Sequence, residues 1–118
     1  MEASPPYYDR EEDAIVMGTS QAFPVSFEVY PPRSPEHLGS LRQAIDHLAG
    51  AAPDFISVTF GAGGSSARDS LGVLDYIAVA TNASPLAHMT CVGNTQQEAT
   101  ALIASFVEAG ITQFLALR

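Results

Sequence analysis

The stretch FISVTF at residues 55–60, followed by GAGGS at residues 61–65, decides the fold class of this chain. The first six residues are nearly continuously apolar and rich in β-branched and aromatic side chains, as is typical of a strand covered on both faces in a parallel sheet. A glycine-rich loop and a helical pattern follow directly. We therefore predict a strand over residues 54–60 that leads into the helix of a βα unit.

An amphipathic helix precedes this strand. Its leucine and isoleucine side chains recur at helical spacing from Leu38 to Leu48, which places them on one face. Ser34 is a suitable N-cap, and Pro35 fits the first turn because a helix leaves its first N–H groups without internal partners. We expect the helix to end near Gly50.

Two further helices are predicted from capping-box spacing. Ser66 and Asp69 stand three residues apart before an apolar repeat, and Thr95 and Glu98 do the same. The second of these helices is expected to end at Gly110, since glycine favours the position just after a helix.

Three other strands complete the pattern. Residues 23–30 are rich in valine and aromatics before Pro31-Pro32, and residues 85–92 and 111–117 are also strand-like. The order βαβαβαβ requires a parallel sheet covered by helices, because crossover connections are right-handed. The fold class is α/β, and 118 residues hold only about half of a (βα)8 TIM barrel, which needs about 250 residues.

The composition and net charge of the chain limit the classes of molecule that it is expected to bind. The net charge of −8, with five arginines and no lysine, argues against a nucleic-acid or anionic-membrane surface and favours small molecules. Arginine still permits a local anion site. The single cysteine, Cys91, excludes an internal disulfide framework and a multi-cysteine metal site, so we expect a cytoplasmic protein.

The start of the chain differs from the rest. Residues 1–21 are acidic, contain prolines and lack sustained periodicity, so we predict a disordered leader before a structured domain at 22–118. No stretch approaches a membrane-spanning length of apolar residues, and the basic-then-apolar order of a secretory signal is lacking.

Candidate functional residues follow from the predicted sheet, because sites in such folds form at the carboxyl ends of the strands. Glu28 interrupts an apolar strand, so burial is expected to tune its ionisation for catalysis or ligand binding; a structural or outward-facing acid is the alternative. Thr59 follows the second strand, and its hydroxyl could simply bond a neighbouring backbone group. The glycine loop could bind an anion or form a tight turn.

Other reactive side chains have plainer interpretations. A lone strand histidine such as His88 is more often a satisfied core residue than a ligand. His37 and His47 fall on the solvated side of the first helix, so the sequence predicts no metal site. Cys91 is expected to pack in the core, and Arg118 to be a solvated charge.

Four segments, SFEVYPPR, FISVTFGAGGS, AHMTC and QFLALR, together resemble the amino-terminal half of the methylenetetrahydrofolate reductase family. The resemblance spans residues 23–118, with each motif at a predicted strand end. It implies the amino-terminal half of a (βα)8 TIM barrel, with about four parallel strands and three helices, that binds FAD. In the family, NADH or NADPH reduces the flavin, which then reduces 5,10-methylenetetrahydrofolate to 5-methyltetrahydrofolate.

The resemblance also implies roles for individual residues. Glu28 matches the family acid that protonates the folate, so that its five-membered ring opens to an iminium. Phe60 stands where relatives often have tyrosine or tryptophan. The implied cofactor contacts are Thr59, Phe60, Ala62, His88, Leu117 and Arg118.

The chain also departs from the family. There, the ALR strand end continues into Gly-Asp and four more βα units follow, so we expect this chain alone to be inactive. The resemblance also implies that the full-length form is a homo-oligomer that acts on folate and NAD(P)H. The alternative is a non-enzymatic α/β half-barrel module that self-associates or binds an anion at the glycine loop. Another reductase or lyase on a similar barrel is a third interpretation.

Overall fold

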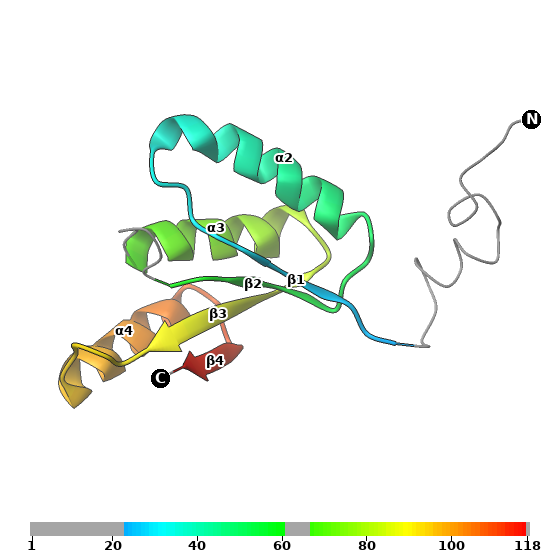
Figure 1. Cartoon of the computed structure of the whole chain (residues 1–118). Helices are drawn as coiled ribbons and strands as arrows, with labels where there is room; N and C mark the ends of the chain where they lie inside the picture. Colours follow the sequence, from blue (N-terminus) through cyan, green and yellow to red (C-terminus); the bar gives the residue numbers. More distant parts are fainter. Residues whose placement is uncertain (1–22, 61–66, 118) are drawn as a thin grey trace, which may run out of the picture.

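Strands and helices alternate along the chain as the sequence predicts. The computed structural model describes residues 23–60 and 67–117; the leader at 1–21 and the glycine loop at 61–65 lie outside the described residues. Figure 1 shows the path of the chain. The elements are β1 (Ser26–Val29), the 3-10 turn η1 (Pro35–His37), α2 (Leu38–Ala49), β2 (Phe55–Val58), α3 (Ala67–Ala80), β3 (Ser84–Thr90), α4 (Gln96–Glu108) and β4 (Phe114–Leu117).

The four described strands form one parallel sheet in the order β1-β2-β3-β4. Sequential order with right-handed crossovers places every connecting helix on the same side of the sheet, whereas a doubly wound fold would reverse direction and use both sides. Figure 1 shows α2 and α3 side by side over the sheet. The predicted α/β fold with four parallel strands and three helices, as in half of a TIM barrel, is confirmed.

The core lies between this helix layer and one face of the sheet. Alternate strand residues point into it, because side chains on a strand alternate between faces. The ring centroids of Phe106 in α4 and Phe114 in β4 lie 6.4 Å apart. The buried cluster includes Val29, Ile56, Val58, Ala87 and Met89 from the strands with Ile45, Val73, Leu74, Ile77 and Phe106 from the helices.

Helix α4 has the ends that its sequence predicts. The Thr95 hydroxyl accepts from the Glu98 N–H at 3.1 Å, and the Glu98 carboxylate accepts from the Thr95 N–H at 2.9 Å, which completes the capping box. At the other end Gly110 has φ +96°. The N–H groups of Gly110 and Ile111 donate to the carbonyls of Val107 and Phe106, which is a Schellman motif.

The start of the first helix differs from the prediction. Ser34 makes no side-chain cap; its hydroxyl instead lies 2.9 Å from Nδ1 of His37. The 3-10 turn at Pro35–His37 precedes α2, which ends at Ala49 as expected. His37 and His47 are exposed, as predicted. Ser66, the predicted cap of α3, lies outside the described residues.

The strands are shorter than predicted, except that β3 begins one residue earlier. Strand β1 covers Ser26–Val29 instead of residues 23–30, because Pro24, Pro31 and Pro32 lack the N–H that a ladder needs. Individual hydrogen bonds between neighbouring strands continue past the strand ends. For example, the Thr59 N–H donates to the carbonyl of Val29 at 3.0 Å. No helix among the described residues is long and apolar enough to cross a membrane.

Candidate functional site

Glu28 and Thr59 meet at the carboxyl ends of β1 and β2. Glu28 is in register with Ser57, and Thr59 lies two residues beyond Ser57, directly after the end of β2, so both side chains project from the same face of the sheet. The Thr59 hydroxyl donates a hydrogen bond to Oε2 of Glu28. The parallel register thus brings together two residues that are 31 positions apart in the sequence.

His88 joins this pair from β3. The register of Val58 with Ala87 places His88 beside Thr59 on the same face. Nδ1 of His88 lies 3.8 Å from Oε2 of Glu28, longer than an N–H···O hydrogen bond of about 2.7–3.2 Å. The two groups therefore attract each other as charges when the imidazole is protonated. Three of the predicted site residues, Glu28, Thr59 and His88, form one cluster.

The carboxyl group of Glu28 is open to solvent. Its side chain is 45% exposed, whereas that of His88 is 9% exposed. The expectation of a carboxyl buried in an apolar strand is wrong, because Phe27 and Val29 point toward the helix layer and Glu28 points to the other face. The alternative of an outward-facing acid is the one that the geometry supports, and partners from β2 and β3 hold the carboxyl at one side.

An apolar strip lies on the same face as this cluster. Leu115 is in register with His88 and Leu117 with Thr90, and each leucine is 44% exposed. The face therefore combines a solvent-accessible acid, a hydroxyl and an imidazole with a short apolar surface. Such a surface suits a flat ring system that needs polar contacts at one edge.

The remaining predicted site residues have different outcomes. Phe60 is half-buried and directly follows Thr59, while Ala62 and Arg118 lie outside the described residues. Cys91 is exposed, so the expectation that it packs in the core is wrong; β3 ends at Thr90, one residue earlier. Within residues 23–60 and 67–117, no group of three or more His, Cys, Asp or Glu side chains could hold a metal ion.

Leu115 is the residue of this face that sequence reasoning missed. Its signal was present in QFLALR, where Leu115 and Leu117 are two residues apart and must share a face of the strand. The family resemblance implies contacts only for the last two residues of this motif, Leu117 and Arg118.

Comparison with known proteins agrees with this architecture. The family model described as methylenetetrahydrofolate reductase matches residues 14–118. The chain belongs to the methylenetetrahydrofolate reductase family. This result confirms the resemblance drawn from the four strand-end motifs.

Individual members of the methylenetetrahydrofolate reductase family show how much of the protein the chain represents. It is 34% identical over 94 residues to the 5,10-methylenetetrahydrofolate reductase of Salmonella typhimurium and 33% identical over 94 residues to that of Escherichia coli, covering 80% of this chain and 32% of each relative. A probable methylenetetrahydrofolate reductase (NADH) of Oryza sativa is 30% identical over 93 residues, covering 79% of this chain and 16% of the relative. The chain thus spans about a third of the bacterial relatives.

Proposed function

We propose that this chain contributes the proton donor to a flavin-dependent reduction of 5,10-methylenetetrahydrofolate to 5-methyltetrahydrofolate, with NADH or NADPH as electron donor. The observation that supports the proposal most directly is the Thr59–Glu28–His88 cluster on the face opposite the helices. The bacterial relatives are named 5,10-methylenetetrahydrofolate reductases, which supports the proposed substrate.

Glu28 is the proton donor in this proposal. Both of its contacts, from Thr59 and from His88, go to Oε2. This arrangement orients the carboxyl from one side, so Oε1 is the oxygen that would present a proton to the substrate. Transfer of that proton to a nitrogen of the five-membered folate ring allows the carbon–nitrogen bond to break, and the ring opens to an electrophilic iminium. General acid catalysis of this kind needs a carboxyl within hydrogen-bond reach of the substrate.

The described residues fit part of a site for FAD. Leu115 and Leu117 provide an exposed apolar surface, and Thr59 and His88 add a hydroxyl and an imidazole at its edge. Bound FAD would supply hydride transfer from the nicotinamide to the folate carbon. We assign cofactor contacts to Thr59, Phe60, Ala62, His88, Leu117 and Arg118.

Turnover requires more of the barrel than this chain contains. The chain spans 32% of the bacterial relatives, and its open sheet face has apolar side chains that a complete barrel would enclose. We therefore propose that the chain alone binds FAD weakly and does not oxidise NADH at a measurable rate.

A chimera tests this function. Residues 23–118 replace the matching segment of the Escherichia coli relative, and flavin content, NADH oxidation and folate reduction are measured for the chimera and for the chain alone. The proposal expects the chimera to contain flavin, to oxidise NADH and to reduce folate. A folded chimera that retains flavin but never reduces folate would contradict the assigned reaction, and tight FAD with turnover in the chain alone would contradict the need for the remaining barrel.

A second candidate, a non-enzymatic α/β half-barrel module that self-associates, is favoured by one observation. Leu115 and Leu117 are exposed next to the sheet edge, and β4 has one neighbouring strand within the described residues. Size-exclusion chromatography separates the candidates: a stable dimer with cooperative melting supports the module, while a monomer that gains flavin only in the chimera supports the reductase.

A further inference from the structure

Ser70 is a buried polar residue that the site described above does not use. It lies in the first turn of α3, and it is 1% exposed. The other buried polar residues of the part of the chain that the structure describes are Ser57 and His88, which lie in the sheet. Burying a hydroxyl is costly unless it forms a hydrogen bond, so the partner of Ser70 indicates what the residue does.

The hydroxyl of Ser70 donates to the main-chain carbonyl of Thr59 at 3.1 Å. A serine within a helix commonly donates to the carbonyl four residues earlier instead. The bond from Ser70 leaves the helix and reaches the residue directly after β2. Ser70 therefore joins the start of α3 to the end of β2, at the residue whose hydroxyl contacts Glu28.

Pro31 explains why the carbonyl of Thr59 needs a partner from a helix. In a parallel sheet, the N–H and the C=O of one residue bond to residues two apart on the neighbouring strand. The Thr59 N–H donates to the carbonyl of Val29, so the regular pattern would pair the Thr59 carbonyl with residue 31. Residue 31 is a proline and has no N–H. A carbonyl without a partner is unfavourable away from water, and Ser70 supplies the missing donor.

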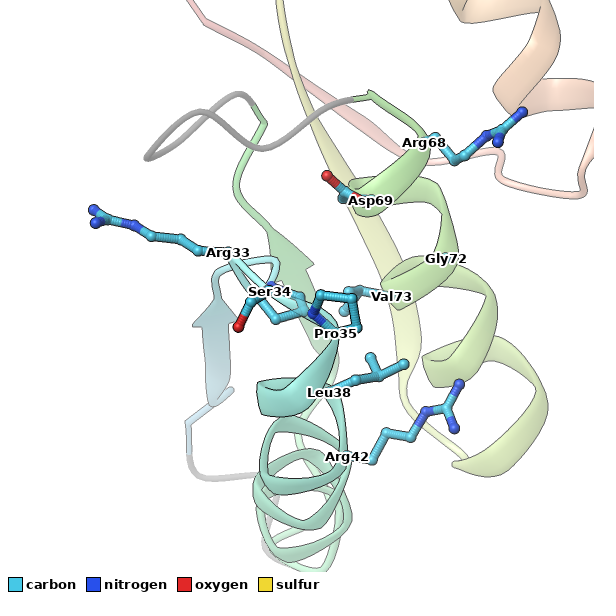
Figure 2. A pocket seen from close by; sticks show the side chains of 10 residues that line it. Arg33, Ser34, Pro35, Leu38, Arg42, Arg68, Asp69, Gly72 and Val73 are labelled. Atoms are coloured by element: carbon cyan, nitrogen blue, oxygen red, sulfur yellow. The ribbon is translucent and has the colours of Figure 1, made fainter.

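The residues around Ser70 on α3 have different surroundings. Four of them border a cavity of about 270 Å³ between α2 and α3, in whose lining Ser70 takes no part: Arg68, Asp69, Gly72 and Val73. Figure 2 shows the guanidinium groups of Arg33 and Arg68 extending away from this cavity. These two positive groups therefore do not face a common ligand there, whereas Ser70 is bound to the end of β2.

We propose that Ser70 is a positioning residue for the proton transfer assigned to Glu28, an inference that rests on the proposed function. The main chain of Thr59 is fixed from two sides, since its carbonyl accepts from Ser70 and its N–H donates to Val29. The hydroxyl of the same residue donates to Oε2 of Glu28. Removing the Ser70 hydroxyl releases one side of the Thr59 main chain, so the Thr59 hydroxyl holds the carboxyl less firmly.

Ser70→Ala in the 118-residue chain tests the effect of Ser70 on Thr59. Three-bond couplings from the Thr59 methyl carbon to the backbone nitrogen and carbonyl carbon report which staggered rotamer the side chain occupies. We expect one rotamer in the unsubstituted chain and an average of rotamers in Ser70→Ala. Val73→Ala is the matched control, because Val73 is buried one turn further along α3, its side chain forms no hydrogen bond, and its truncation destabilises the core. One rotamer should persist in this control.

The chimera tests the effect of Ser70 on the reaction. We expect Ser70→Ala to lower the rate of folate reduction about threefold to tenfold, the factor that corresponds to the net contribution of one hydrogen bond. Flavin content and NADH oxidation with an artificial acceptor should stay near the values of the unsubstituted chimera, and Val73→Ala should leave all three quantities unchanged. In a chimera that already carries Thr59→Val, Ser70→Ala should lower the rate by less than about twofold, because the hydroxyl through which Ser70 acts is missing.

Three results would overturn the proposal. A single Thr59 rotamer in Ser70→Ala would show that the main-chain bond does not fix the side chain. Equal rate losses from Ser70→Ala with and without the Thr59 hydroxyl would show that Ser70 acts by another route, and equal losses in Ser70→Ala and Val73→Ala would make Ser70 structural only. An unsubstituted chimera that reduces no folate contradicts the proposed function instead, and the Thr59 couplings still decide whether Ser70 positions Thr59.

Discussion

The hydroxyl of Thr59 donates to Oε2 of Glu28 and so links the carboxyl ends of β1 and β2 on the sheet face opposite the helices. Family resemblance assigned Thr59 to the cofactor. We propose a second, positioning role for Thr59, because a hydroxyl bound to one carboxylate oxygen restricts the direction of the other.

Thr59→Val tests this positioning role. Valine keeps the shape of threonine and removes the donor, so in the chimera we expect folate reduction to fall at least about tenfold, the lower end of the range for a hydrogen bond to a charged group. Thr59→Ser keeps the hydroxyl and should restore most of the rate. A rate loss in Thr59→Val that is fully explained by lost flavin would instead make Thr59 a cofactor contact alone.

Glu28→Gln tests the proton donor. The amide keeps the size and the acceptor for Thr59 but cannot donate an acidic proton, so folate reduction in the chimera should fall at least about a hundredfold. NADH oxidation with an artificial acceptor and flavin content should stay near the unsubstituted values. Loss of flavin together with both activities would show that Glu28 supports the structure.

Gly110→Ala tests the end of α4. Gly110 has φ +96°, and a Cβ there would meet no atom within 4 Å, so the cost is backbone strain alone. We expect the free energy of unfolding to fall by about 1 kcal/mol in urea denaturation. Gly39→Ala is the matched control: Gly39 lies in α2 with equal space, and alanine there should raise stability by about 0.5–1 kcal/mol. Equal effects at both positions would contradict the Schellman motif.

The Tyr76–Asp46 contact predicts a pH dependence. The Tyr76 hydroxyl donates to Oδ1 of Asp46 at 2.8 Å, and this bond raises the pKa of Tyr76 above the ordinary tyrosine value of 10.0; desolvation and the Asp46 charge also raise the pKa, and Arg42 lowers it. A raised pKa means that the bond stabilises the fold below pH 10.0 and is lost as the tyrosinate forms above it.

Absorbance titration of tyrosine checks this direction. Asp46→Asn should move the Tyr76 transition to lower pH, because it removes the Asp46 charge and leaves a weaker hydrogen bond to a neutral amide oxygen. Tyr76→Phe identifies which of the four tyrosines is observed. Asp75→Asn is the control, since this neighbouring exposed acid is not among the causes. An unchanged transition in Asp46→Asn would contradict the assigned cause.

Periodicity was enough to predict the order of the elements but not the faces of β1. Leu38 to Leu48 and the Thr95–Glu98 box are local patterns, and each formed the expected helix. The sequence-based interpretation of SFEVY is an apolar strand interrupted by a buried acid, although its alternation already places Glu28 on the face opposite Val29. Which face of the sheet is covered depends on where the helices pack. The sequence of a single strand does not contain that information.

The cavity between the first turns of α2 and α3, with Arg33, Arg42 and Arg68 in its lining, could not be predicted from local sequence. Arg33, Arg42 and Arg68 have no helical or strand periodicity in common, and they come from a loop and two different helices. They line one space because the right-handed crossover returns α3 beside α2. Juxtapositions of this kind depend on the whole topology.

Side chains along β1 alternate between the two faces of the sheet, so the site depends on whether an insertion in this strand has an odd or an even number of residues. Inserting a single residue between Pro24 and Glu28 would exchange the two faces, turning the acid into the helix layer and an apolar side chain toward solvent. Inserting two residues would keep the acid on its face and displace it along the strand. Natural insertions and deletions in this strand should therefore have even numbers of residues. Those with odd numbers should lie before the hydrogen bond in which the carbonyl of Val25 accepts from the N–H of Asp54.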